Sequence, residues 1–246
     1  MMWRFLLLFL FTHPAHARVF DFEQYTVGTY FKGNYGLTGV GKDAYEHSSG
    51  TGNFFSDSPT FNWGGEAGLL LATGSQFGIR LGYELVSPQK QSGISGTDSG
   101  GTQTLTLESS VIGKFPVAHI EMYLSNNSKT SHFILSAGGG YGTVDMKNSY
   151  SNAAFPSYTE KGTATTYMLE AATGFEFLFT DNITILADLG YRYVPKTNFK
   201  AQNTFTNAYG AVITKGDILR NADGSARQLD IGGAWIGLGF RFYIKL

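Results

Sequence analysis

The sequence predicts an all-β fold, a single antiparallel up-and-down transmembrane β-barrel of eight strands. Every second residue from Leu246 back to Ala234 is apolar, whereas the residues between them include Lys245, Arg241 and two glycines. This alternation is typical of a strand with lipid on one side and a polar lumen on the other. Beyond residue 17 no run of eighteen apolar residues predicts a transmembrane helix, and a closed barrel is the other structure that pairs every backbone group in lipid. The 32 glycines favour a narrow, curved sheet.

The first 17 residues have the pattern of a secretory signal peptide. Arg4 precedes an apolar run over residues 5–11, and Ala15 and Ala17 provide a small-residue cleavage site. We therefore expect residues 18–246 to form the barrel. Removing Arg4 leaves 17 basic and 19 acidic residues, a net charge of −2, which argues against nucleic acid as a partner. The absence of cysteine excludes disulfides and thiolate metal sites.

Eight segments alternate with a period of two and are predicted as strands. They cover residues 25–35, 61–73, 76–86, 104–124, 132–147, 163–180, 183–194 and 229–246. The connections between them alternate between long and short, and the long ones, at residues 36–60, 87–103, 148–162 and 195–228, are predicted as exposed loops. Asp223 and Gly224 form a turn signal in the last loop, so its flanking strands could extend as a hairpin.

The fourth segment contains Pro116, and its pattern is interpreted as two halves. Leu105, Leu107 and Val111 are predicted to face outward, whereas Ile120 carries the apolar face after the proline. A proline inside a strand is typical of a β-bulge, and one extra residue at Phe115–Pro116 would shift the alternation in this way.

Aromatic residues are predicted to form two belts where lipid meets water. The belt near the long loops comprises Trp63, Tyr83, Tyr141, Tyr167 and Tyr193, and the belt near the short turns comprises Phe77, Phe133, Phe179 and Phe242.

Charged residues collect at the positions predicted to face the lumen: Lys32, Glu66, Arg80, Glu84, Glu108, Lys114, Glu170, Glu176, Asp188, Arg192 and Arg241. An eight-stranded barrel has an interior just wide enough for its side chains or one small ligand, and buried charges must pair. The first interpretation is a salt-bridged plug that fills the barrel. The alternative is a narrow, gated conduit in which the pairs exchange partners.

With this strand pattern the chain resembles the small eight-stranded outer-membrane proteins of Gram-negative bacteria, the group of the OmpA transmembrane domain, OmpX and OmpW. The resemblance covers residues 19–246 and rests on the pattern, with the last strand similar to the signal that the barrel-assembly machinery reads. That signal usually ends in phenylalanine, and here Leu246 stands in its place. The resemblance implies an integral protein of the outer membrane, with short periplasmic turns and long extracellular loops. It implies outer-membrane lipid and the assembly machinery as partners.

These observations favour a barrel with a filled lumen that serves envelope structure or surface interaction through its outer loops. The second hypothesis is a narrow channel for small solutes, and the third is an enzyme that modifies lipid or peptide. His47, His119 and His132 match no hydrolase signature, so we expect no enzyme, and no cofactor or metal is expected.

Small residues on the predicted outer face indicate a further contact. Gly65, Ala67, Ala137, Gly139 and Ala171 would leave shallow patches on the apolar surface. Small residues let neighbouring chains approach closely in lipid, so lateral homo-oligomers are one expectation. Ordinary variation of lipid-facing residues is the alternative.

Overall fold

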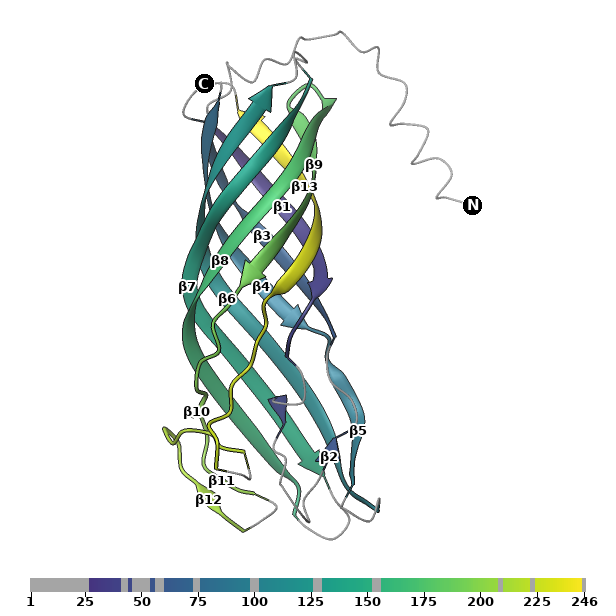
Figure 1. Ribbon diagram of the computed structural model, residues 1–246, viewed down its shortest axis with the longest axis vertical. Coiled ribbons are helices and arrows are strands. Elements are labelled where there is room, and N and C mark those ends of the chain that lie inside the picture. Colours follow the sequence, from purple (N-terminus) through teal and green to yellow (C-terminus); the bar gives the residue numbers. More distant parts are fainter. Residues whose placement is uncertain are drawn as a thin grey trace, which may run out of the picture.

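Eight antiparallel strands form a closed ring in the computed structural model (Figure 1). The structure describes residues 27–40, 44–45, 54–55, 60–72, 76–97, 102–125, 130–151, 156–207, 210–221 and 224–244. In order around the ring, the strands are β1 (Val27–Leu37), β3 (Phe61–Ala72), β4 (Phe77–Pro88), β6 (Gln103–Ser125), β7 (Ser131–Ser151), β8 (Tyr158–Thr180), β9 (Ile183–Tyr193) and β13 (Gly233–Ile244). Each predicted strand overlaps one of these, which confirms the eight-stranded barrel. The predicted signal peptide lies outside the described residues.

The last strand closes the ring. β13 pairs with β1 from Val27–Ile244 to Gly36–Trp235 and with β9 on its other side. Pairing on both sides leaves β1 and β13 without a free edge, and an exposed edge is what a sheet in lipid must avoid.

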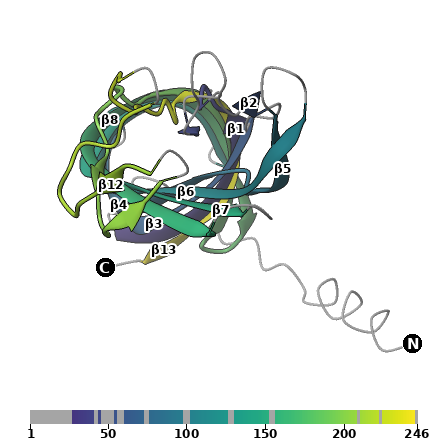
Figure 2. The same cartoon turned by 90° about the horizontal axis from the view of Figure 1, so that it is seen from below.

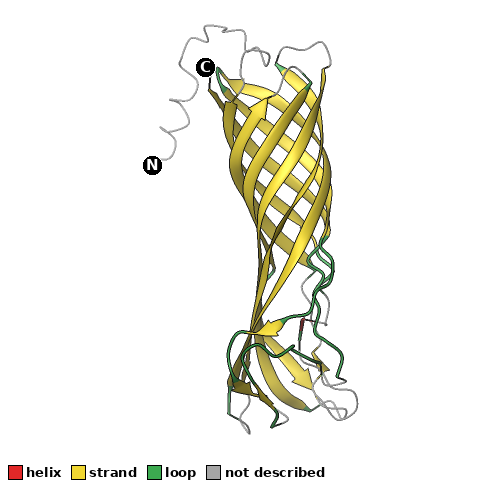
Figure 3. Cartoon of the chain, turned by 90° about the vertical axis from the view of Figure 1, so that its left-hand side faces the viewer, coloured by secondary structure: helices red, strands yellow, loops and turns green. Residues whose placement is uncertain are grey.

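Three ring strands are much longer than a membrane crossing requires. β6, β7 and β8 contain 23, 21 and 23 residues, whereas about 9–11 residues of a tilted strand cross the hydrocarbon layer. At the long-loop end these strands continue beyond the ring as a twisted wall, at the bottom of Figure 1 and Figure 3. Five short strands lie there: β2 (Phe54–Phe55), β5 (Gln91–Thr97), β10 (Lys200–Ala201), β11 (Phe205–Thr206) and β12 (Val212–Ile213).

The prediction of irregular loops is therefore wrong in part. β5, within the predicted loop 87–103, pairs with β6, and Figure 2 shows it outside the ring. In the loop 195–228, β10 pairs with β8. Arg220 pairs with Ala226 around Gly224, and Asn198 pairs with Gln228, in agreement with the hairpin expected there. β5 and β10 form strands because the long β6 and β8 offer them free edges beyond the ring.

The outward face of the long strands changes character at a pair of tyrosines. Tyr141 of β7 lies opposite Tyr167 of β8. On the short-turn side the outward residues are largely apolar, including Phe133, Leu135 and Leu169, whereas beyond the tyrosines they are polar: Thr143, Asp145, Lys147, Lys161, Thr163 and Thr165. The inward face changes in the opposite sense and becomes apolar. The tyrosines thus mark where the barrel leaves lipid and enters water.

This reversal corrects the interpretation of the fourth segment. Leu105, Leu107 and Val111 are buried inside rather than exposed outside, because the wall stands in water at that height. β6 keeps one register with β7 on both sides of Phe115 and Pro116, from Lys114–Thr143 to Val117–Gly140. The predicted bulge is therefore wrong. The register continues past the proline, and a Cβ on Gly140 would lie 2.1 Å from the Pro116 carbonyl oxygen, so only glycine fits this close approach.

Among the described residues, no helix is long and apolar enough to cross a membrane.

Candidate functional site

Buried charges fill the lumen in three connected groups, and the first lies near the short turns. Arg241 of β13 contacts Glu121 of β6 at 2.7 Å and Glu176 of β8 at 3.0 Å. Glu176 also lies 3.0 Å from Nε2 of His132 and accepts a 2.6 Å hydrogen bond from the hydroxyl of Tyr243. Four ring strands thus contribute charged or hydroxyl groups to a single carboxylate–guanidinium cluster.

The second group lies around Glu66. Its carboxylate contacts Lys32 Nζ at 3.1 Å and Arg80 Nε at 3.2 Å, and it accepts a 2.6 Å hydrogen bond from Tyr30. Arg80 reaches Glu121 at 3.3 Å, which links this group to the first. Lys32 also contacts Asp188 at 3.3 Å, which joins β1 to β9 past the intervening β13.

The third group lies toward the long loops. Arg192 donates hydrogen bonds to Glu84 and to Glu170, the second at 2.8 Å. Glu170 also lies 3.2 Å from Nε2 of His119, and Asn34 donates a 3.0 Å hydrogen bond to Glu84. Charge-assisted contacts of this kind offset the cost of removing the ions from water.

We call this assembly the lumen network: Lys32, Glu66, Arg80, Glu84, His119, Glu121, His132, Glu170, Glu176, Asp188, Arg192 and Arg241. It contains six carboxylates, four permanent cations and two histidines. The histidine contacts to Glu170 and Glu176 supply hydrogen-bond partners to these two buried carboxylates.

The structure brings most of the predicted lumen residues together. Glu66, Arg80, Glu84, Glu170, Glu176, Asp188, Arg192 and Arg241 lie in the network with Lys32. Glu108 and Lys114 do not, which corrects their placement. The side chain of Glu108 is 62% exposed opposite Lys90, and Lys114 contacts Asp145 at 2.8 Å on the outer face. Both belong to β6, where the predicted phase shift assigned them to the wrong side.

Sequence reasoning missed three members of the network. Glu121, His119 and His132 are buried and occupy inward positions of β6 and β7. The signal was present, because each alternates with outward apolar residues such as Ile120 and Phe133. If the short-turn half of β6 had been treated as one uninterrupted strand, its alternation would have placed Glu121 and His119 in the lumen.

The structure places all nine predicted belt aromatics on the outer face. Trp63, Tyr83, Tyr141, Tyr167, Tyr193, Phe77, Phe133 and Phe179 are exposed, and Phe242 is half-buried beside Phe31 at 5.8 Å between ring centroids. Tyr167 and Tyr193 lie 6.5 Å apart, and Trp63 lies 4.5 Å from Tyr35.

The small outward residues form two separate patches rather than one. Ala137 lies directly opposite Ala171, with Gly139 next along β7. Gly65 and Ala67 lie on β3, which β4 and β6 separate from β7. The lateral homo-oligomer stays a prediction, with the β7–β8 patch as its more extensive surface.

Apolar side chains cover the lumen network at the long-loop end. This loop-end core combines inward residues of β6, β7 and β8 with residues of the long connections: Val40, Ala44, Tyr45, Ile94, Leu105, Leu107, Val111, Phe115, Val117, Val144, Met146, Tyr150, Ala164, Met168, Val194, Phe199, Ala201, Leu219, Leu229 and Ile231. The connection after β1 is held inside by Asn148, which donates a 2.9 Å hydrogen bond to the carbonyl of Ala44. The connections thus pack into the barrel mouth.

A buried ion pair fastens the last long connection to the wall. Arg227 donates hydrogen bonds to both carboxylate oxygens of Glu160 on β8. Glu160 also accepts from Tyr150 at 3.2 Å, and Arg227 donates to the carbonyl of Arg220 at 3.1 Å. Removing one partner of such a pair leaves an uncompensated buried charge.

We expect Arg227→Met to release the 195–231 connection while the ring stays folded. Glu160 would lose its cation inside the loop-end core, and opening of the connection would let water reach the carboxylate. Proteinase K digestion of the protein in vesicles should cut this connection at least tenfold faster than in the wild type. Arg220→Met, an exposed arginine of the same connection, is the control, and equal cleavage of wild type and Arg227→Met would contradict the role of the pair.

In the part of the chain that the structure describes, no group of three or more histidine or acidic residues is arranged to hold a metal ion.

Comparison with known proteins agrees with this architecture. The family model described as "Outer membrane protein beta-barrel domain" matches residues 4–242. No curated protein matches the chain in sequence. A major outer membrane protein from Thermus thermophilus has a similar structure, with 12% identity, a TM-score of 0.50 and coverage of 89% of this chain and 100% of that one. This likeness concerns the fold alone.

Two further solved structures are also similar to this chain. Ail, the attachment invasion locus protein of Yersinia pestis, is 11% identical, with a TM-score of 0.37 and coverage of 89% of this chain and 99% of that one. The outer membrane protease OmpT from Escherichia coli is 10% identical, with a TM-score of 0.41 and coverage of 89% and 94%. The match over nearly the whole sequence therefore assigns the chain to the outer membrane protein beta-barrel family, as an integral protein of the bacterial outer membrane.

Proposed function

We propose that this protein is a non-conducting barrel that serves envelope structure or surface interaction through its extracellular wall and connections. The observation that carries the proposal is the loop-end core, whose apolar side chains cover the lumen network at the extracellular mouth. On the short-turn side of this core, two carboxylates contact each of the three arginines Arg80, Arg192 and Arg241. An ion that passed through would have to break these pairs and then cross an apolar layer, and both steps are costly.

A narrow channel for small solutes is the second candidate. It is favoured by buried polar atoms without a hydrogen-bond partner, among them Asn34 Oδ1, Glu84 Oε2 and Asp188 Oδ1. Such atoms are sites where water molecules would be expected. A conduit requires these waters to connect through the loop-end core, and the buried Phe115 and Met168 oppose such a connection.

We also infer a non-enzymatic role. His119 and His132 are buried and hydrogen-bonded to Glu170 and Glu176, so neither imidazole is exposed to a lipid or peptide substrate. Turnover of outer-membrane lipid or of a peptide library by the purified protein would contradict this inference.

Planar bilayer recordings test the absence of conduction. We expect the refolded wild type to give no single-channel steps under conditions in which a general porin, as positive control, conducts. Insertion of the protein is verified by its heat-modifiable band in the same vesicles. Reproducible steps in the wild type that disappear in Arg192→Ala would overturn the proposal in favour of the channel, because Arg192 contacts Glu84 and Glu170 in the lumen.

A further inference from the structure

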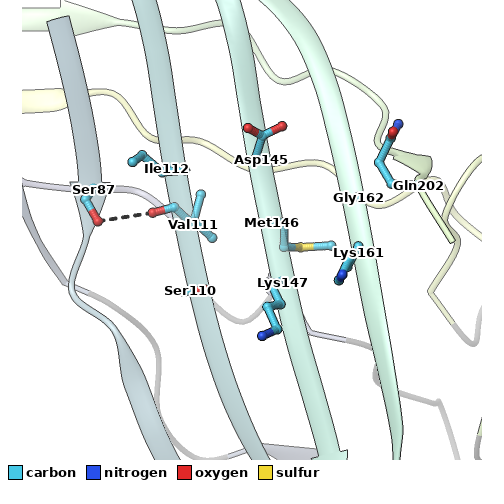
Figure 4. Close-up of a pocket in the computed structure, with 10 residues that line it drawn as sticks. All are labelled: Ser87, Ser110, Val111, Ile112, Asp145, Met146, Lys147, Lys161, Gly162 and Gln202. Atoms are coloured by element: carbon cyan, nitrogen blue, oxygen red, sulfur yellow. Dashed lines mark hydrogen bonds between the residues drawn. The ribbon is translucent and has the colours of Figure 1, made fainter.

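A groove of about 430 Å³ lies against the wall beyond the tyrosine belt. Its lining comes from the end of β4, from residues 110–112 within β6, from β7 and β8, and from Gln202 after β10. Apolar atoms, including those of Val111, Ile112 and Met146, make up most of this lining. Ser110, Asp145, Lys147 and Lys161 in this lining point away from the lumen, since they alternate with buried neighbours. Figure 4 shows Lys147 and Lys161 on adjacent strands. A volume of this size suits a small ligand.

Four polar residues form one row across the groove. Ser110 lies opposite Lys147, and Lys147 lies opposite Lys161. Gln202 extends the row, since its backbone N–H donates a 2.8 Å hydrogen bond to the carbonyl of Lys161. The backbone register thus places two lysines side by side, with Ser110 on one flank and Gln202 on the other.

The two lysines form a repulsive pair. Residues directly opposite in an antiparallel sheet have Cβ atoms about 4.5–5.5 Å apart, and like charges there are destabilising. Among the described residues, no salt bridge joins Lys147 or Lys161 to a carboxylate. A bound anion between the ammonium groups would turn this repulsion into two charge-assisted contacts.

The carboxylate that lines the groove, that of Asp145, is hydrogen-bonded to residues other than the two lysines. Asp145 accepts 2.8 Å hydrogen bonds from Lys114 and from Thr163. Partial burial works against its ionisation, but these hydrogen bonds hold the pKa of Asp145 below its usual value. Asp145 therefore stays ionised and paired with Lys114, and the positive charge of Lys147 and Lys161 is left for a ligand.

The height of the lysine pair above the membrane indicates where that ligand comes from. Lys147 and Lys161 each lie six residues beyond the belt tyrosines, Tyr141 and Tyr167. This is about 20 Å along the strands and about 15 Å along the barrel axis at the usual tilt. The headgroup layer of an ordinary phospholipid leaflet is only about 5–8 Å thick, so its phosphates lie below the pair. A glycolipid whose charged sugars extend above that layer reaches it.

We propose that this groove binds the phosphorylated sugar headgroup of an outer-leaflet glycolipid, with a phosphate held between Lys147 and Lys161. Ser110 and Gln202 donate hydrogen bonds to the phosphate or to the sugar hydroxyls beside it. The belt tyrosines lie on the same two strands at the level of the lipid, so a glycolipid could contact the wall from its acyl chains to its sugars. Binding should weaken with salt, as expected for exposed charges.

Titration of the full-length protein in detergent with purified lipopolysaccharide tests the proposal. We expect Lys147→Gln with Lys161→Gln to weaken the affinity at least tenfold. The matched control, Lys90→Gln with Lys215→Gln, removes two exposed positive charges outside the groove and should change the affinity less than twofold. Chemically dephosphorylated lipopolysaccharide should bind the wild type as weakly as intact lipopolysaccharide binds the groove variant. Equal affinity of wild type and groove variant, or an equal loss in the control, would overturn the proposal.

A second variant separates binding from folding. Lys161→Glu replaces the repulsive pair with an attractive one, so thermal stability without lipid should equal or exceed that of the wild type while lipopolysaccharide binding is lost. Retained binding would refute the site. The deacylated, phosphorylated core oligosaccharide distinguishes the source of the phosphate: it should bind at least tenfold more weakly than the intact lipid. Equal affinity would assign the groove to a free sugar phosphate and overturn the lipid assignment.

Discussion

Deletion of residues 239–246 should abolish assembly of the barrel. The deletion removes the half of β13 that pairs with β1 between Val27 and Lys32 and with β9 around Ile185. Both neighbours would present unpaired backbone groups to lipid, and each such group costs several kcal/mol. The deletion also removes Arg241, the cation between Glu121 and Glu176. In a vesicle-folding assay, the truncated protein should show no heat-modifiable band.

A deletion of similar size at the opposite end is the control. Residues 206–212 connect Phe205 of β11 to Ile213 of β12, which are already cross-strand neighbours. Their removal leaves the ring untouched, so the band shift should persist. A folded, heat-modifiable barrel from the 239–246 deletion would mean that β1 and β9 can close the ring without the second half of β13.

The ring itself could be predicted from sequence because its two environments are opposite in polarity. Between the belts, lipid selects Ile79 and Leu81 on one side of β4, and the lumen selects Arg80 on the other. A period of two combined with that contrast fixes which face is which. The same contrast placed Arg192 and Arg241 in the lumen.

The wall could not be predicted in this way. The two-residue alternation continues from the ring into the wall, but the apolar side of the strands changes from the outer face to the inner face. At Leu107 and Val111 the outside is water and the inside is apolar, so an apolar residue points inward where a membrane rule predicts outward. The sequence marks the change at Tyr141 and Tyr167, beyond which the apolar residues, such as Val144 and Met146, occupy the other alternating set of positions. The partners within the network were also beyond pattern reasoning: the contact of Arg192 with Glu84 depends on how the closed ring brings β9 across from β4.

Arg241→Leu should lower the free energy of unfolding by about 3–5 kcal/mol, the usual cost of removing one partner from a buried ion pair. Arg241 is 1% exposed, and its guanidinium contacts Glu121 and Glu176. Both carboxylates would be left buried at this end of the lumen with one cation fewer. Urea titration in phospholipid vesicles, followed by the heat-modifiable band, measures the change. Arg220→Leu makes the same chemical change on an exposed loop residue and should stay within about 0.5 kcal/mol of wild type.

A compensated variant tells charge pairing apart from loss of packing. Arg241→Leu combined with Glu121→Gln and Glu176→Gln removes the cation together with the two charges that it balances. Replacing a whole buried ionic group by neutral residues is often close to neutral for stability, so the triple variant should recover at least half of the lost free energy. If the triple variant is as unstable as Arg241→Leu, the volume of the arginine side chain rather than its charge stabilises the lumen. If Arg241→Leu itself unfolds at the same urea concentration as wild type, water already reaches the two glutamates and the lumen is not a sealed network.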